Sequence, residues 1–543
     1  MPEVPGHHLR AYAPDPGRGA EVDQRSPGEA APEEALNESR RRWLGLASGL
    51  VLAVLVYVLL PADLASGAKL TAATAVLMGL WWMTEAIPIP ATALVPLVIF
   101  PIFGQDVEFS AVGARYGDSI IFLFMGGFML ALAMQRWNLH RRIALLTVRA
   151  MGTKPSQVIA GFMIATGFLS MWVSNTATAV MMLPIGVSVL LLVGNLGTTP
   201  GAGDLDGDGA AGADLAGADP QSTKVKDAVI KSNFGTALML GIAYAASLGS
   251  LATIIGTPPN TLLVGYLKET HDIEIGFGQW MLVGLPLAII FTVIAWFLLT
   301  KVLFKPEIKE IPGGRQLMDD ELAKLGPTSV GEKRVLAIFV LAAVSWIGFP
   351  LVFDTSPISD SGIAMTIGLL LFILPGGAAR GVRLLDWESA KELPWGVLLL
   401  FGGGLALSGQ FTSSGLTKWI GEQASSLSVR PVLLVVAILA TVILFLTELT
   451  SNTATAATFL PVAGGIALGL DLNPMLLTIP VALAATCAFM LPVATPPNAI
   501  AYGSGYVTVA QMIRGGIWLN LIGIVLVTLT TMTLAAWVFS LMS

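Results

Sequence analysis

Two short polar motifs each occur twice in an otherwise apolar chain. Residues 174–178, Ser-Asn-Thr-Ala-Thr, recur letter for letter as residues 451–455, at an offset of 277. Residues 257–260, Thr-Pro-Pro-Asn, recur as residues 495–498, at an offset of 238. Hydroxyl and amide groups supply hard oxygen ligands for a small cation and hydrogen-bond donors for an anion. The doubled motifs therefore predict an ion-binding site that is built from two structural repeats.

The residue types in these motifs predict that helices break at them. Asn is a poor helix former, and Ser, Asn and Thr favour caps, so each Ser-Asn-Thr run should divide its apolar stretch into two half-helices. The prolines of Thr-Pro-Pro-Asn remove backbone donors and stop helix continuation, which frees carbonyl groups beside a hydroxyl. Free carbonyls suit a hard cation, and the N-terminus of the next half-helix presents unpaired N–H groups to an anion.

None of the four motifs contains Arg, Lys or His. Even one charge at the middle of a bilayer costs about 2.5–3.5 kcal/mol or more, so a dianion bound there needs its charge compensated. Bound cations are the natural source of that compensation, which favours cation-coupled transport in which sodium helps to build the anion site. The alternative is that Ser-Asn-Thr joins helices through polar contacts. This alternative is less favoured because both copies of Ser-Asn-Thr are followed by Thr-Pro-Pro-Asn in the same order.

The composition places the motifs in a polytopic membrane protein. The 543 residues are 54% hydrophobic and 12% charged, with a mean hydropathy of +0.75. A membrane span needs about 20 apolar residues, and the apolar stretches could supply around ten of them. The net charge of −6 gives no reason to expect a nucleic-acid partner. The apolar stretches lack the converging acid, base or nucleophile of an enzyme, so we expect no catalysis and no cofactor beyond coupling ions.

The N-terminal segment sets the expected orientation. Residues 1–42 hold 14 of the 66 charged residues, and a segment of this composition is expected to form a disordered cytoplasmic tail. Arg40, Arg41 and Arg42 directly precede the first apolar run, and positive residues at the edge of a span favour the cytoplasmic side. We therefore expect the N-terminus to lie inside the cell.

Two further polar segments divide the rest of the chain. Residues 197–226 form a polar insert, which opens like a calcium-binding EF-hand loop but has Leu215 where a bidentate Glu belongs. The insert is therefore interpreted as a flexible acidic linker. Residues 305–334 form a charged linker. The first membrane repeat region then covers residues 43–304 and the second covers residues 335–543.

A Gly-rich apolar stretch precedes each Ser-Asn-Thr motif. Residues 119–134 are followed by a basic turn, and residues 395–410 by a turn of small and polar residues. Each stretch looks too short and too broken to span, which predicts a re-entrant helical hairpin in each repeat. Paired interrupted segments in matching positions of two halves indicate the binding site of a transporter.

Two acidic residues in the apolar regions have no assigned role at this point. Glu85 follows the Trp81-Trp82 pair, and Glu448 lies three residues before Ser451. A coupling or proton-relay role is one interpretation of Glu448. Neutral or paired residues at the ends of spans are the other interpretation for both, and the sequence favours that one.

The complete set of motifs resembles one transporter family. Gly-Thr-Pro-Pro-Asn at 256–260 and Ala-Thr-Pro-Pro-Asn at 494–498, together with the doubled Ser-Asn-Thr, are similar to the divalent anion:sodium symporters. This family includes sodium-coupled dicarboxylate and citrate transporters, and the resemblance covers residues 43–541. It implies an all-α polytopic membrane protein with about eleven transmembrane helices plus two re-entrant hairpins in two inverted repeats. It also implies a homodimer in which a transport domain moves past a fixed scaffold in an elevator-type cycle.

The resemblance also implies site residues and a substrate class. One sodium site would use Ser170, Ser174, Asn175 and Gly256. The second sodium site would use Thr447, Thr450, Asn452 and Ala494. The anion would contact Asn175, Thr176, Thr257, Asn452, Thr453, Thr495 and Pro496. The implied activity is import of C4-dicarboxylates such as succinate, malate and fumarate across the cell membrane by symport with sodium. Citrate or other tricarboxylate symport, sulfate symport and sodium-independent dicarboxylate exchange stay open as alternatives.

Overall fold

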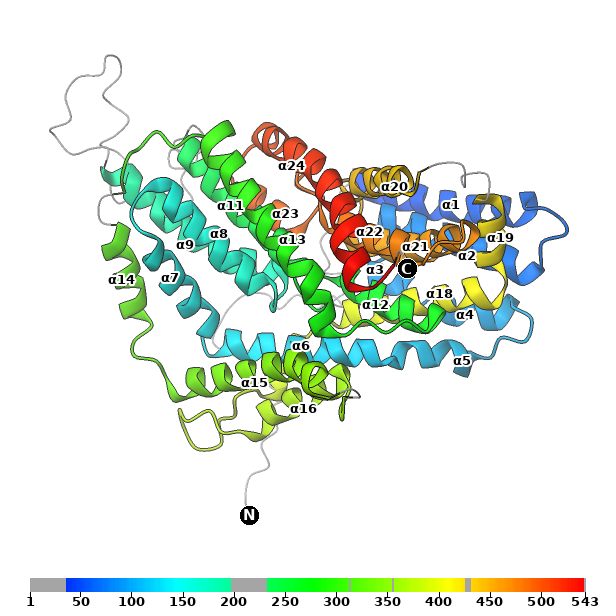
Figure 1. Ribbon diagram of the computed structural model, residues 1–543, viewed down its shortest axis with the longest axis horizontal. Coiled ribbons are helices and arrows are strands. Elements are labelled where there is room, and N and C mark those ends of the chain that lie inside the picture. Colours follow the sequence, from blue (N-terminus) through cyan, green and yellow to red (C-terminus); the bar gives the residue numbers. More distant parts are fainter. Residues whose placement is uncertain (1–35, 197–231, 312–313, 354–355, 425–430, 542–543) are drawn as a thin grey trace, which may run out of the picture.

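The computed structural model describes residues 36–541, apart from residues 197–231, 312–313, 354–355 and 425–430. In this part of the chain the secondary structure is helical, with one isolated bridge between Pro375 and Arg383 as the β pairing (Figure 1). The polar insert at 197–226 and the first 35 residues of the predicted tail lie outside the described residues. The last seven residues of that tail, 36–42, are helical because they are mostly Leu, Glu and Arg, which favour helices.

Helices follow one another with short connections throughout the described residues. In the first half they are α1 (Leu36–Leu59), α2 (Ser66–Thr84), α3 (Ile89–Thr92), α4 (Val95–Phe103), α5 (Phe109–Ala114), η2 (Arg115–Gly117), α6 (Ser119–Arg136), α7 (Leu139–Met151), α8 (Pro155–Ser170), α9 (Asn175–Leu196), α11 (Asn233–Ser250), α12 (Pro258–His271), α13 (Phe277–Phe297) and η3 (Leu298–Leu303). In the second half they are α14 (Gly314–Lys324), α15 (Val330–Val352), α16 (Asp360–Ile373), α17 (Trp387–Ala390), α18 (Trp395–Ser413), α19 (Leu416–Ala424), α20 (Val432–Thr447), α21 (Asn452–Gly469), α22 (Met475–Thr486), α23 (Pro496–Gly503), α24 (Val509–Thr530), η5 (Thr531–Ala535) and α25 (Ala536–Val538).

Many of these helices are apolar enough to lie in a membrane. Six helical runs within the described residues have the length and composition of a membrane span, among them Phe109–Arg136 and Val509–Val538. Six shorter apolar helices accompany them, and these include α8, α20 and α22, which end just before the motifs. Short helices that stop inside the protein are expected where the backbone lines a site rather than lipid.

The helix boundaries repeat at the offsets that the motifs predict. Helices α8 and α20 both start and end 277 residues apart, and α9 and α21 begin at Asn175 and Asn452. Helices α12 and α23 begin at Pro258 and Pro496, which keeps the offset of 238. The repetition in sequence therefore corresponds to a repetition of helices.

Each Ser-Asn-Thr motif lies between two helices, and in the first repeat these helices run in opposite directions. Gly167 of α8 packs against Gly249 of α11, and Gly241 packs against Met163, so α8 and α11 run in the same direction. Helix α9 starts where α8 ends, and its Gly186 packs against the middle of α11, so α9 runs back along it. The motif is therefore the tip of an α8–α9 hairpin. The apolar run divides into two helices at the motif, as predicted, but the second helix turns back and does not continue an interrupted span.

The Gly-rich stretches that were expected to form broken hairpins are continuous helices, α6 and α18. A Cβ atom on Gly126 would lie 2.5 Å from the backbone of Ala364, and one on Gly403 would lie 2.3 Å from the carbonyl oxygen of Ala93. These glycines permit close helix packing, and they do not break the helix. The hairpins lie one step further along the chain, at α8–α9 and at the matching pair α20–α21.

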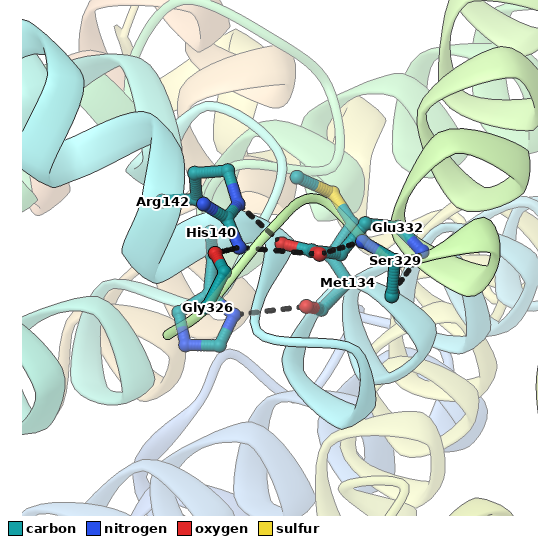
Figure 2. A network of polar contacts seen from close by, with 6 residues as sticks. All are labelled: Met134, His140, Arg142, Gly326, Ser329 and Glu332. Atoms are coloured by element: carbon teal, nitrogen blue, oxygen red, sulfur yellow. Dashed lines mark hydrogen bonds and ion pairs between the residues drawn. The ribbon is translucent and has the colours of Figure 1, made fainter. Parts of the chain in front are cut away.

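The charged linker binds the amphipathic helix α7. The guanidinium of Arg142 donates to the Glu332 carboxylate at 2.6 Å and to the Gly326 carbonyl at 3.0 Å (Figure 2). Glu332 and Ser329 cap the start of α15 with reciprocal hydrogen bonds (Figure 2). Two further ion pairs join α7 to α14, Arg141–Glu321 and Arg149–Asp319, both at 2.7 Å. The connection between the two repeats is thereby attached to the helix that leads into the first hairpin.

Candidate ion and anion site

All four motifs line one cavity of about 950 Å³. Every residue predicted to contact the anion lies in its wall, and so do six of the eight predicted for sodium. The two exceptions are Ser170 and Thr447, which are fully buried behind the hairpin tips. Residues 277 and 238 apart in sequence thus meet in space, as the sequence predicts.

Four helices begin in the wall of this cavity. Asn175, Pro258, Asn452 and Pro496 are the first residues of α9, α12, α21 and α23. A helix N-terminus carries a partial positive charge that favours an anion. Helices α12 and α23 begin with Pro-Pro, which has no N–H groups, and Thr495 caps the Asn498 N–H, so these two ends supply the helix dipole rather than free donors.

Helices α8, α11, α20 and α22 end before the motifs, and their last carbonyls have no intrahelical N–H partner. Side chains already bond to carbonyls near these ends, such as Ser170 to Ala246 and Thr447 to Ala485. The cavity therefore combines positive helix ends for an anion with carbonyl and hydroxyl oxygens for cations.

The first set of predicted cation ligands surrounds the tip of α8–α9. Ser170 Oγ donates to the Ala246 carbonyl at 2.5 Å, which ties the end of α8 to α11. Ser174 Oγ accepts from the Ala177 N–H at 3.2 Å and so caps α9. A Cβ atom on Gly256 would lie 2.3 Å from the carbonyl oxygen of Ser250, the last residue of α11, so only glycine fits there.

The second set has the same plan with different side chains. Thr447 Oγ1 donates to the Ala485 carbonyl at 2.9 Å, as Ser170 does to Ala246, and lies 2.8 Å from Asn452 Oδ1. Thr450 Oγ1 contacts Thr455 Oγ1 at 2.7 Å. Both sets thus place hydroxyl and amide oxygens beside the end of a broken segment.

The two threonines that precede Pro-Pro differ in their hydrogen bonding. Thr495 Oγ1 accepts from the Asn498 N–H at 3.3 Å and caps α23. Thr257 makes no cap bond, and its hydroxyl lies 3.5 Å from that of Thr486. Both threonines are about 1% exposed, so their own side chains are largely removed from water.

The last residue of each Thr-Pro-Pro-Asn motif holds the loop before it, a role that the sequence reasoning missed. Asn260 Nδ2 donates to the carbonyls of Leu251 and Thr253 at 3.3 and 2.9 Å. Asn498 Nδ2 donates to the corresponding loop, at 3.2 Å to the carbonyls of Ala488 and Leu491. The signal for this role is present in the sequence, because the same Asn ends both motif copies.

Charged side chains outside the motifs also line the cavity. Arg41, Glu85 and Glu392 lie in its wall. Arg41 and Glu85 are 3.5 Å apart with side chains 59% exposed, so their pairing is solvated and weak. The absence of basic residues thus holds for the motifs but not for the whole cavity, whose wall contains Arg41. The sequence marks Arg41 and Glu85 as notable but does not place them at the cavity, and Glu392 carries no sequence signal, because all three come from segments distant from the motifs.

Comparison with known proteins assigns the family. Residues 40–541 match the family described as the sodium:sulfate symporter transmembrane region. The chain belongs to this divalent anion:sodium symporter family. A sodium-dependent dicarboxylate transporter of Staphylococcus saprophyticus is 41% identical over 502 residues, which cover 91% of this chain and 92% of that protein. The transporter of the same name from Staphylococcus aureus strain USA300 is 42% identical over 496 residues, 89% and 90% of the two chains.

A solved structure shares the fold of this symporter. The structure of Neisseria gonorrhoeae MtrF, described as one of a class of antimetabolite efflux pumps, superposes with a TM-score of 0.51 at 11% sequence identity. The match covers 91% of this chain and 98% of MtrF, and at this identity it shows the fold alone. The chain is a multi-pass membrane transporter of a symporter family and not an enzyme.

Proposed function

We propose that this protein imports C4-dicarboxylates such as succinate, malate and fumarate together with sodium ions. The observation that carries the proposal is the meeting of four helix N-termini at one cavity whose motifs contain no basic side chain. Helix ends favour an anion by about 0.3–1 kcal/mol each, up to about 2 kcal/mol where partly buried, which falls short of a full counter-charge for a dianion. Sodium ions at the neighbouring oxygen ligands supply the remainder. The names of the Staphylococcus relatives support the same substrate class and ion.

Each repeat contributes one sodium site and one half of the anion site. Asn175 and Asn452 take part in both, because each starts a helix at the cavity and carries an amide oxygen beside the cation ligands. Thr257 and Thr495 donate their hydroxyl hydrogens to the two carboxylates of the substrate. The other sodium ligands are the two sets of hydroxyl and backbone groups described above, one around the tip of each hairpin.

The packing of the broken segments supports inverted repeats. Helices α11 and α22 are equivalent in the two repeats, as are α12 and α23. In space α11 packs against α23, and α12 packs against α22, so the two segments cross in opposite directions (Figure 1). Equivalent segments that run antiparallel are the mark of an inverted repeat, which supports alternating access by movement of one unit against another. The elevator-type cycle and the homodimer belong to the proposal through membership of the family.

The cavity is proposed to open toward the cytoplasm in this structure. Arg41 lies in its wall and belongs to the basic cluster that precedes the first apolar run. Basic residues at the end of a span favour the cytoplasmic side, so the mouth marked by Arg41 faces the cytoplasm and the N-terminus lies inside. The outward-facing form then requires the motifs to move to the opposite side of the membrane.

Uptake by proteoliposomes tests the proposed function. Purified protein is reconstituted, and uptake of labelled succinate is measured with an inward gradient of sodium and with potassium in its place. We expect uptake only with sodium, and competition by malate and fumarate. Competition by citrate or sulfate but not by malate would instead indicate one of the alternative substrates. Equal uptake in sodium and potassium would refute the role of the cation, and exchange without sodium would indicate an exchanger.

A further inference from the structure

One carboxylate lies beside the second cation site without lining the cavity. Glu448 is 3% exposed and directly follows the last residue of α20. Its Oε1 accepts from the N–H groups of Phe489 and Met490 at 2.7 and 2.9 Å, and its Oε2 accepts from that of Leu491 at 3.0 Å. Asn520 Nδ2, from α24, completes the shell at 2.6 Å. Within the described residues no Lys, Arg or His side chain pairs with it.

The partners of Glu448 fit an ionised carboxylate. Three of them are backbone N–H groups, which can donate a hydrogen bond but cannot accept one from a carboxyl proton. Hydrogen bonds donated to a carboxylate stabilise its charged form. A fixed negative charge therefore lies within the apolar part of the protein, close to the second set of cation ligands.

The first repeat has no charge at the corresponding position. The residue 277 positions before Glu448 is Met171, whose backbone carbonyl accepts from Thr253 Oγ1 at 2.5 Å. The loop that contains Thr253 corresponds to the loop that Glu448 binds. At this position the two repeats therefore differ by a carboxylate, and they also differ at Thr450, which stands where the first repeat has Val173.

The carboxylate acts on the second cation site through its neighbours. Thr447, which precedes it, is one of the predicted sodium ligands, and Ala494 lies three residues after the loop that it binds. The N–H groups of that loop donate to Glu448. The carbonyls of Ala488 and Leu491 in the same loop accept hydrogen bonds from the Asn498 side-chain amide. Glu448 thus fixes the loop that leads to Ala494, and it directly follows Thr447 in the chain.

We propose that Glu448 makes the second cation site the stronger of the two, so that the site of Thr447, Thr450, Asn452 and Ala494 fills with sodium first. This inference rests on the proposed sodium coupling. Glu448 is a positioning residue, because it holds the loop and supplies charge but does not line the cavity. The charge raises the affinity for a cation by Coulomb attraction, which is strong at short range away from water.

Sodium-dependent thermal stability of the full-length protein in detergent tests this inference without relying on transport. Unfolding is followed in increasing NaCl, with choline chloride keeping the ionic strength constant and with no dicarboxylate present. A ligand that binds only the folded state raises the Tm according to its concentration and affinity. We expect the wild type to show a tight and a weak phase of stabilisation. In E448Q the half-saturating sodium concentration of the tight phase should rise on the order of tenfold or more.

The corresponding position of the first repeat offers matched variants. M171E places a carboxylate beside the first cation site and should shift the weak phase to lower sodium, whereas M171Q should leave both phases unchanged. If E448Q fails to fold, the difference between M171E and M171Q decides the question. Unchanged half-saturation in folded E448Q, or equal behaviour of M171E and M171Q, would overturn the inference and leave the proposed function intact. If sodium does not stabilise the wild type beyond choline, the proposed sodium coupling itself fails.

Discussion

The hydroxyl of Thr257 allows the proposed anion site to be tested one hydrogen bond at a time. Thr257 is buried in the cavity wall at the start of α12, and its hydroxyl forms no cap bond. Its contact with the Thr486 hydroxyl is long, at 3.5 Å, and the proposed role requires its hydrogen to turn from Thr486 to a substrate carboxylate. The hydroxyl of Thr495, at the same position of the other repeat, accepts from the Asn498 N–H but also retains its hydrogen. The two positions therefore share the proposed donor role and differ in the cap.

The size of the effect follows from the charge of the acceptor. A hydrogen bond to a charged group contributes about 1.5–3 kcal/mol, and 1.4 kcal/mol corresponds to a factor of ten, so loss of the donor should raise KM for succinate roughly 10- to 100-fold. Ala and Val both remove the donor, whereas Ser keeps it and should have little effect at either threonine. At Thr495, Ala and Val also remove the cap of α23, which costs about 1 kcal/mol of stability.

Uptake kinetics of Ala, Ser and Val variants at Thr257 and Thr495 decide between a donor role and a packing role. Initial rates are measured in proteoliposomes at saturating sodium, with protein amounts matched, and thermal unfolding is recorded for each variant. If the hydroxyl donates to the substrate, the Ser variant should have a KM for succinate close to that of the wild type, and the Val and Ala variants should both have a raised KM. Packing alone gives the reverse, with Val tolerated and Ser as harmful as Ala. Val better than Ser at both positions would remove these hydroxyls from the anion site.

Three further predictions follow from the geometry. Asn175→Ala and Asn452→Ala should each weaken the binding of both sodium and succinate in uptake titrations, because each Asn serves both ligands and binding linkage is reciprocal. Unchanged sodium dependence in either variant would contradict the shared role. Gly256→Ala should abolish uptake, because its Cβ would lie 2.3 Å from the Ser250 carbonyl oxygen at the end of α11. Normal uptake would show that the backbone there can shift without loss of the site. The hydrogen bond from Lys324 holds the pKa of Glu321 below its usual range, so the stability that this carboxylate contributes is present at neutral pH. It is lost as the pH falls through the lowered pKa, so the Tm difference between wild type and E321Q should vanish in acid.

The meeting of the four motifs at one cavity was predictable from the sequence because the signal is local and doubled. Each motif consists of residues that end helices, and the common offsets indicated that the copies belong together. The direction of the chain at Ser-Asn-Thr was not predictable in the same way. A break in an apolar run is compatible with a kinked span and with a hairpin. The choice is made by packing such as that of Gly167 against Gly249, which joins segments 82 residues apart (167 to 249).

The error about the glycines has a physical cause. Glycine lowers helix propensity, so Gly-rich stretches were expected to be broken. Inside a bundle the lost propensity is offset where a glycine lets two backbones approach, as Gly126 does against Ala364. The sequence contains no local mark that separates these two uses. Arg41 and Glu392 were missed for a related reason, since they reach the cavity from separate segments and neither belongs to a motif.

The positions at which the two repeats differ in residue type predict a functional difference between the two cation sites that the identical motifs do not. Two identical halves would provide two equal cation sites, and nothing would determine which one fills first. The chain has Thr447 where the first repeat has Ser170, Ala494 where it has Gly256, and Glu448 where it has Met171. The first two changes keep a backbone or hydroxyl oxygen in place and alter only the space around it. The third adds a charge to one site alone, so an order of sodium binding can arise from a single residue.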